Sequence, residues 1–379
     1  MREIETPEDL KRWLAEDDRE PAAVQALDLT PHADVFSSQA FPESLFLGCT
    51  MTDAEAGHLV NTGATVLRNP EAFLFSSHRR ALYTPDELFP DFDVDDPEAH
   101  LTTLDNRIYE QYLEHGSYQP SSIAVTLAQR LHDHSITDAL EEALAGRKVV
   151  AIMGGHSMER RDPMYAAVAR IARRLTREGY LMLSGGGPGA MEATHLGAYV
   201  ANFDDDAALD RALEILSVRP DGAKPGKEYA DPDWLHRAMR TRAELPLPNP
   251  VRHDSLGIPT WHYGHEPPAA FATLIAKYFA NSVREEGLLA VANHGVVFSP
   301  GSAGTTQEIF QDAAQNHYKS YGPPAPMVFL GTEHWTKTRP VWPLLQHVAE
   351  GHDYGKLLHL TDDEDAIVQR ILDYVPAEE

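Results

Sequence analysis

The sequence contains a single cysteine, Cys49, so an intrachain disulfide is excluded. The thiol follows the apolar residues Leu45, Phe46 and Leu47, and we expect it to be a small buried hydrophobic group rather than a nucleophile. One cysteine in 379 residues fits a reducing cytoplasm.

Long apolar runs are also missing. No stretch approaches the roughly 20 apolar residues that a membrane-spanning helix needs, and the N-terminal segment lacks the basic start and apolar run of a signal peptide. We therefore expect a cytoplasmic protein with no membrane partner. With 42% hydrophobic residues, the chain can still bury one large core and a smaller second one.

Basic residues are few: 32 Lys and Arg stand against 58 Asp and Glu, which gives a formal net charge of −26. Binding to a nucleic acid backbone depends on clustered Lys and Arg, so we expect no nucleic acid partner. A small phosphorylated ligand stays possible, because it needs only a local pocket of donors. We predict no metal site: His132 and His134 have no partner at ligand spacing, and both are expected to be solvent-exposed.

Small polar residues follow three apolar, strand-like runs. The runs at 148–153, 180–183 and 295–298 lead into Gly-Gly-His-Ser at 154–157, Ser-Gly-Gly-Gly-Pro-Gly at 184–189 and Ser-Pro-Gly-Ser-Ala-Gly-Thr-Thr-Gln-Glu at 299–308. Helical patterns follow at 163–178, 190–198 and 309–315. Repeated strand–loop–helix units predict the α/β class, with a doubly wound, Rossmann-like parallel sheet.

The loop at 299–308 is suited to hold an oxyanion. Its glycines let the backbone approach a ligand closely, and the free N–H groups of a helix N-terminus point at an anion. Thr305 can cap the helix or donate to a phosphate, and Glu308 lies about one turn further on. A plain corner with a capping Thr and a first-turn Glu has the same pattern. The grouping of three such strand ends favours a ligand site.

We divide the chain into an N-terminal α+β extension of unknown role at 1–145 and a Rossmann-like domain at 146–379, for which the family resemblance described below implies nucleotide binding. Residues 219–255 are rich in Pro, Asp and Lys and form an insertion, which is a lid or a plain surface loop. A helix and a strand are predicted within 204–217, and a helix over 268–284. Trp261, His262 and Tyr263 either stack on a ligand's base or belong to the core.

These three stretches together resemble the LOG-like family, whose members were formerly mislabelled lysine decarboxylases. The family pattern is a strand with a small polar turn, then G-G-x-x-G-x-M, then P-G-G-x-G-T-x-x-E. Residues 154–157, 185–191 and 300–308 occupy those places in the same order, and the resemblance covers about 147–331. It implies hydrolysis of the N-ribosidic bond of a nucleoside 5′-monophosphate, with a purine or cytokinin-type base, to free base and ribose 5-phosphate. It also implies a homodimer and no cofactor.

The resemblance also implies roles for individual residues. Glu308 and Arg284 take the catalytic places, and Arg284 stands one residue before Glu285, where an ungapped count from the last motif falls. The implied substrate-binding residues are Gly155, Ser157, Gly186, Gly187, Gly189, Gly301, Ser302, Gly304 and Thr305. Ser302 replaces the second glycine of the family pattern, which carries a cost if that position needs a positive φ.

Other functions remain open from the sequence. The first alternative is a nucleotide-binding sensor or carrier with the same fold and no enzymatic activity; Glu308 is the only residue that separates it from the hydrolase. A single-stranded DNA-binding protein is disfavoured by the negative charge. Lysine decarboxylation is disfavoured because residues 295–315 contain no lysine for a Schiff base.

Overall fold

The chain folds into two compact units in the computed structural model, which describes residues 1–69, 73–120, 122–218, 226–231 and 233–376. The first unit comprises Met1–Leu82 and Glu110–Ala143, and the second comprises Tyr83–Tyr109 and Leu144–Glu379. The sequence placed the division near residue 145. The structure groups Tyr83–Tyr109 with the larger, C-terminal unit.

The first unit is built on a parallel sheet of four short strands in the order β1-β2-β3-β4. Its core holds an aromatic cluster, in which the rings of Phe36, Phe41 and Phe46 lie 5.2 to 5.9 Å apart. All strands of this extension are parallel, which the sequence pattern did not reveal. The elements are β1 (Arg2–Ile4), α1 (Pro7–Leu14), β2 (Ala22–Gln25), α2 (Ala33–Phe36), β3 (Leu45–Leu47), α3 (Asp53–Asn61), β4 (Thr65–Leu67) and α7 (Ile123–Leu144), and the chain enters the unit within α6 (Leu104–Glu114).

Two predictions about single side chains concern this unit. Cys49 is buried, and burial raises the pKa of its thiol to about 11, which confirms a packing group rather than a nucleophile. The prediction of exposure was right for His134 and wrong for His132. His132 lies on the same face of α7 as Ala128 and Ile136, one turn away on either side, and that face is buried.

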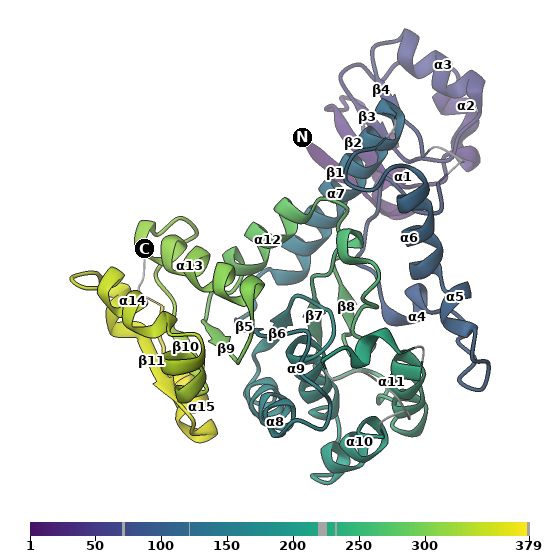
Figure 1. Ribbon diagram of the computed structural model, residues 1–379. Helices are drawn as coiled ribbons and strands as arrows, with labels where there is room; N and C mark the ends of the chain where they lie inside the picture. The colour runs from purple at the N-terminus through teal and green to yellow at the C-terminus, as the bar shows by residue number, and fades with distance from the viewer. Residues whose placement is uncertain (70–72, 121, 219–225, 232, 377–379) are drawn as a thin grey trace. The chain divides into compact units, whose positions relative to one another are not determined.

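The second unit contains seven parallel strands in the order β11-β10-β9-β5-β6-β7-β8, with helices on both faces (Figure 1). This arrangement confirms the predicted α/β fold with a doubly wound, Rossmann-like parallel sheet. The central strand β5 is buried along its whole length, as its uninterrupted apolar run requires. The strands are β5 (Val149–Met153), β6 (Leu181–Ser184), β7 (Ser255–Gly257), β8 (Leu274–Ile275), β9 (Val296–Phe298), β10 (Met327–Leu330) and β11 (Leu358–Thr361).

Helix ends in this unit follow from the local sequence. In α8, Asp162 caps the N-terminus by accepting from the N–H of Met164, Pro163 takes the first position, and Gly179 follows the helix end with φ +88°. The helices are α4 (Pro85–Leu88), α5 (Ala99–Thr102), α8 (Pro163–Arg177), α9 (Ala190–Val200), α10 (Ala208–Leu216), α11 (Asp233–Glu244), α12 (Asn281–Ala290), α13 (Ala303–Tyr318), α14 (Val341–Val348) and α15 (Glu364–Leu372), with short helical turns η2 (Glu228–Ala230), η3 (Trp261–Tyr263), η4 (His334–Thr338) and η5 (Asp353–Leu357).

Three predicted segments differ from the structure. Residues 204–217 contain α10 and no strand, and the predicted helix at 268–284 is replaced by β8 and the start of α12. The apolar stretch from Ala269 to Ala272 is buried throughout, and such a stretch carries no periodicity that separates helix from strand. The insertion at 219–255 contains η2 and α11; residues 219–225 and 232 lie outside the described residues.

Among the residues that the structure describes, no helix combines the length and the apolar character needed to cross a membrane.

Candidate functional site

The order of the strands creates a crevice at the centre of the second unit. From β5 the chain proceeds to β6, β7 and β8 on one side, then returns to β9 beside β5 and continues to β10 and β11 on the other side. Between β5 and β9 the direction of winding reverses. In open α/β sheets ligands bind at this reversal, beyond the carboxyl ends of the strands.

Three loops meet at this place, because glycine allows their backbones to touch. The N–H of Gly155 after β5 donates to the carbonyl of Pro300 after β9 (3.1 Å), and the N–H of Ala190 donates to the carbonyl of Gly155 (3.2 Å). Gly189 has φ +69°, and a Cβ there would lie 2.3 Å from the Gly155 oxygen. A Cβ on Gly154 would lie 2.0 Å from Oγ of Ser299. Side chains at Gly154 and Gly189 would therefore separate the loops.

A cavity of about 450 Å³ lies over these loops, within the range of small-molecule sites. We call it the phosphate-loop cavity. It is lined by Gly154, Gly155, His156, Met191, Tyr263, Glu266, Arg284, Glu285, Ser302, Ala303, Gly304, Thr305, Gln307, Glu308 and Gln311. Within the described residues, no three His, Cys, Asp or Glu side chains are placed to hold a metal ion.

The structure brings together six of the eleven site residues named from the sequence, and five lie elsewhere. The six that line the cavity are Gly155, Arg284, Ser302, Gly304, Thr305 and Glu308. Those outside its lining are Ser157, Gly186, Gly187, Gly189 and Gly301. Ser157 is exposed, whereas the three glycines after β6 are buried and shape the loop. Gly301 packs against Thr305: a Cβ there would lie 2.1 Å from its Oγ1.

Ser302 fits its position without backbone strain. Its φ is −119° and it precedes α13 as the N-cap, so the glycine of the family pattern is not required here for a positive φ. Its side chain makes no capping hydrogen bond to the helix. The first N–H groups of α13 therefore receive no hydrogen bond from the Ser302 side chain. Residues of this first turn line the cavity.

Glu308 is held in an environment that favours its neutral form. Burial raises the pKa of its carboxyl to about 7, and the nearby Glu285 adds to the rise, while the Arg284 guanidinium acts in the opposite direction. Near neutral pH the carboxyl is protonated about half of the time, so it can donate a hydrogen bond to a ligand as well as accept one.

Arg284 lies in the first turn of α12, not at the end of a helix as predicted. Its Nε donates to the carbonyl of Ile258 (2.9 Å) and its Nη2 to that of Gly185 (3.3 Å). A Cβ on Gly185 would lie 2.5 Å from Nη2. The guanidinium thus ties the ends of β6 and β7 together and presents its remaining edge to the cavity.

Several cavity residues escaped the sequence argument. Gln307 and Gln311 flank Glu308 at helical spacing, and His156 follows the first glycine pair, so position relative to the motifs could have indicated these three. Glu266 and Tyr263 come from the segment after β7, whose path only the fold determines. Of the three aromatic candidates at 261–263, Tyr263 lines the cavity, whereas Trp261 is buried and stacks on Phe279 at 4.5 Å.

A buried histidine fixes the loop after β6. Nε2 of His195 lies 2.8 Å from Oγ of Ser184, and its Nδ1 lies 3.0 Å from Oγ of Ser255 on the next strand. Ser184 in turn accepts the N–H of Gly186 (3.0 Å). Burial lowers the pKa of His195 to about 3, so the ring is neutral and serves to hold the loop.

A buried ion pair fixes α9 behind the same loop. Arg160 donates from Nε and Nη2 to the two carboxylate oxygens of Glu192 (2.9 and 2.6 Å), and Tyr165 donates to one of them (2.8 Å). The guanidinium also lies 4.4 Å from the centre of the Trp234 ring. Both charged side chains are almost fully excluded from solvent. The pair joins the segment after β5, α9 and α11 into one structure.

Raising the pH from 5 to 8 is expected to destabilise the wild type relative to Glu308→Gln. The carboxyl has its ordinary pKa of 4.5 in the unfolded chain and about 7 in the folded one, so the stabilisation it gives is complete below pH 4.5 and is lost as the pH rises through 7. Thermal unfolding midpoints of both proteins across this range measure the effect. Exposed Glu350→Gln is the control, and a constant difference between wild type and Glu308→Gln contradicts the assigned environment.

Comparisons with known proteins give no family for the chain. No protein-family model matches it, and no curated protein does. Solved structures with some similarity are a molybdenum cofactor binding protein from the phototrophic bacterium Rippkaea orientalis and the Moco carrier protein from Chlamydomonas reinhardtii. Their sequences are 12% and 15% identical to this chain, respectively. Each match covers 60% of this chain, and the matches cover 96% and 98% of the two proteins' own lengths. The TM-score is 0.35 in both cases.

These comparisons correct two predictions. The assignment to the LOG-like nucleoside 5′-monophosphate phosphoribohydrolases is wrong, and so is the predicted hydrolysis of the N-ribosidic bond: the similar structures named here are cofactor-binding and carrier proteins, and no family model supports the assignment. The catalytic roles assigned to Glu308 and Arg284 depended on that activity. At this identity and TM-score, the likeness says nothing of the ligand of this chain.

Proposed function

We propose that the protein binds a phosphorylated, nucleotide-like ligand and holds it intact, as a carrier or a sensor. The observation that carries this proposal is the phosphate-loop cavity at the reversal point of the sheet, whose lining combines the uncapped N-terminus of α13 with carboxyl side chains. The ligand class that matches both features is a nucleoside 5′-monophosphate or a compound of similar build.

The start of α13 supports binding of the phosphate. The helix has 16 residues, and its first N–H groups carry the partial positive charge of the helix dipole. Gly304 has no neighbouring atom within 4 Å of where a Cβ would be, which leaves room for a phosphate next to the backbone. The Thr305 hydroxyl lines the same space and can donate to a phosphate oxygen.

The carboxyl side chains support binding of a sugar. Glu266, Glu285 and Glu308 line the cavity together with His156, whose Nδ1 lies 3.9 Å from a carboxylate oxygen of Glu266. Carboxylates accept hydrogen bonds from ribose hydroxyls in other nucleotide sites of doubly wound sheets. These carboxyl groups disfavour a second anionic group in the cavity, so a ligand with a single phosphate suits the charge distribution.

The state of Glu308 and Arg284 supports an intact ligand. Cleavage of a ribosidic bond develops positive charge at the sugar, and a fully ionised carboxylate stabilises that charge. Glu308 has a pKa of about 7 and is only partly ionised at neutral pH. Arg284 uses two of its nitrogens on backbone carbonyls. Both side chains are better suited to recognition of a ligand than to its cleavage.

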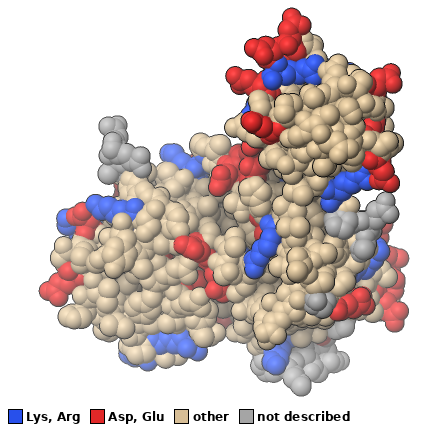
Figure 2. Space-filling view, turned by 90° about the horizontal axis from the view of Figure 1, so that it is seen from above, with Lys and Arg blue, Asp and Glu red and all other residues tan. Residues whose placement is uncertain are grey.

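A small molecule suits this surface better than a nucleic acid. The formal charge of −26 opposes a polyanion. On the face in Figure 2, Lys and Arg side chains lie singly or in small groups among Asp and Glu, without a broad basic area.

Calorimetry with a panel of nucleoside 5′-monophosphates, their nucleosides and the molybdenum cofactor tests the proposal, and chromatography after the titration shows whether the ligand is intact. We expect micromolar or tighter binding of at least one phosphorylated ligand and recovery of that ligand unchanged. Release of free base, or no binding to any member of the panel, would contradict it.

We also expect a homodimer, because a doubly wound sheet with long flanking helices offers apolar faces for association. Light scattering at micromolar concentration should give twice the chain mass of 42.0 kDa. A mass equal to that of one chain overturns this expectation.

A further inference from the structure

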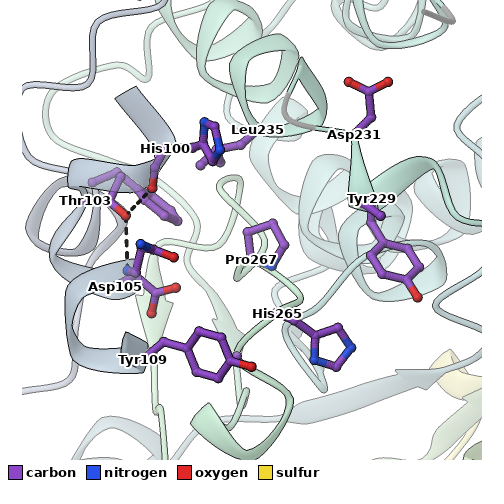
Figure 3. A pocket seen from close by; sticks show the side chains of 13 residues that line it. His100, Thr103, Asp105, Tyr109, Tyr229, Asp231, Leu235, His265 and Pro267 are labelled. Carbon is purple, nitrogen blue, oxygen red and sulfur yellow. Dashed lines mark hydrogen bonds between the residues drawn. The ribbon is translucent and has the colours of Figure 1, made fainter. Parts of the chain in front are cut away.

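A second, smaller cavity of about 170 Å³ lies in the same unit, and we call it the aromatic cavity. Figure 3 shows His100, Asp105 and Tyr109 on one side of it and Tyr229 on the other; Pro267 also lines the cavity. The residues come from α5, α6, η2 and the segment after β7. None of them belongs to the three glycine loops.

The two cavities are neighbours that share a wall. Within the segment 263–267, Tyr263 and Glu266 line the phosphate-loop cavity, whereas His265 and Pro267 line the aromatic cavity. The His156 ring of the first cavity lies 5.5 Å from the Tyr229 ring of the second, at nearly a right angle. The aromatic cavity therefore adjoins the phosphate-loop cavity along the segment 263–267 and at the contact between His156 and Tyr229.

The size of the aromatic cavity fits part of a ligand. Cavities that hold whole drug-sized molecules have volumes of roughly 300–1,000 Å³. The phosphate-loop cavity, at about 450 Å³, is in this range, and the aromatic cavity, at about 170 Å³, is below it. The aromatic cavity therefore has room for a single flat ring system whose remaining part is bound in the phosphate-loop cavity.

The walls of the aromatic cavity determine which ring system fits. Tyr109, Tyr229 and His265 offer flat faces on which a heterocycle can stack. The Tyr109 ring packs closely against Gly264, since a Cβ on Gly264 would lie 2.2 Å from it. When an aromatic side chain is already held in one position, less conformational entropy is lost as a ligand ring stacks on it.

A buried carboxylate supplies the polar contact. Asp105 lines the cavity and is nearly inaccessible to solvent, and one of its oxygens accepts from Nζ of the fully buried Lys277. Lys277 also lies 5.0 Å from the centre of the Trp261 ring. This contact fixes the orientation of the Asp105 carboxyl group. Among the described residues, no hydrogen bond from a protein donor reaches the second oxygen of Asp105.

We propose that the aromatic cavity takes the heterocyclic base of the phosphorylated ligand, with the ring between Tyr109 and Tyr229 and an amino group of the base donating to Asp105. This inference rests on the proposed function, because the phosphate-loop cavity must hold the rest of the ligand. It assigns base recognition to segments outside the sheet: Tyr83–Tyr109, η2 and the turn after β7.

Binding of AMP and of ribose 5-phosphate, measured by calorimetry on four variants, tests the ring contact. Tyr109→Ala is expected to weaken AMP by about 5- to 100-fold and to leave ribose 5-phosphate unchanged, since only AMP has a ring to stack. The exposed Tyr318→Ala is the matched control and should change neither ligand. Thr305→Ala should weaken both, whereas Thr306→Ala, outside the cavity lining, should weaken neither.

The outcomes separate the two proposals. If Thr305→Ala weakens both ligands and Tyr109→Ala weakens neither or both equally, the base lies elsewhere and only this inference fails. If neither ligand binds to the wild type, this inference fails, and the proposed function fails as well when no other member of the panel binds.

The polar contact has its own test. Wild type should bind AMP about 10-fold more tightly than purine riboside 5′-monophosphate, which lacks the amino group. Asp105→Asn leaves the Lys277 ammonium buried without a counter-charge and can unfold the protein, so the double variant Asp105→Leu/Lys277→Met is used, with circular dichroism as the check of folding. Loss of the preference in the folded double variant supports the contact. Equal affinity of the wild type for the two nucleotides, or a preference that survives the double substitution, overturns it.

Discussion

Removal of the 5′-phosphate from the ligand is expected to weaken its binding by roughly 30- to 700-fold. Two or three charge-assisted hydrogen bonds from the start of α13 and the Thr305 hydroxyl are lost, worth about 2–4 kcal/mol in total. Calorimetric titrations of AMP and adenosine under the same conditions measure the difference. The protein is the same in both titrations and the two ligands differ only in the 5′-phosphate, so the difference in affinity measures the contribution of the phosphate.

Two threonines distinguish this account from a general effect of ligand charge. Thr305 is buried and lines the cavity, whereas Thr306 is not part of the cavity lining and its hydroxyl donates to the backbone carbonyl of Ser302 (3.0 Å). Thr305→Ala should therefore reduce the preference for AMP over adenosine, and Thr306→Ala should retain it. Equal affinity of the wild type for the two compounds would show that α13 does not bind the phosphate.

Glu192→Gln is expected to destabilise the protein by about 3–5 kcal/mol. The substitution keeps the shape of the side chain but leaves the Arg160 guanidinium buried without its main counter-charge, and an uncompensated buried charge has a cost of that order. Urea unfolding followed by circular dichroism measures the change. The effect is on the free energy of unfolding, because Glu192 does not line either cavity.

Two controls test the cause of this destabilisation. The double variant Arg160→Met/Glu192→Leu removes both charges and should recover much of the lost stability. Glu364→Gln breaks the more exposed pair between Arg170 and Glu364 and should cost less than about 1 kcal/mol. If Glu192→Gln is no more harmful than Glu364→Gln, the buried pair does not stabilise α9 as described.

The strands and helices around the glycine loops were predictable because their signals are local. An uninterrupted apolar run such as Val149–Met153 indicates a buried parallel strand, and the stripe of apolar residues in Pro163–Arg177 indicates a helix with one inner face. The prediction failed between residues 268 and 284. There the apolar residues from Ala269 to Ala272 are all buried, so this stretch has no periodicity that distinguishes a helix from a strand.

The lining of the phosphate-loop cavity was only partly predictable. Gly155, Ser302, Gly304, Thr305 and Glu308 stand within or beside loops whose composition marks them. The structure separates them from Gly186, Gly187 and Gly189, whose composition is equally suggestive but which are buried and outside the lining. A glycine has the same appearance in a sequence whether it admits a ligand or another loop, and the neighbouring backbone decides between the two.

By itself, the sequence determined the fold class, the positions of the loops at the strand ends and the burial of Cys49, since these depend on local periodicity and on the number of apolar residues. Only the tertiary structure decided which loops surround a cavity, that Arg284 ties β6 to β7, and that Asp105 and Lys277 form a buried pair 172 positions apart in the chain. The physical reason is that the order of strands in the sheet brings distant segments together. Burial then changes the charge state of groups such as Glu308, whose pKa of about 7 depends on neighbours that no local pattern specifies.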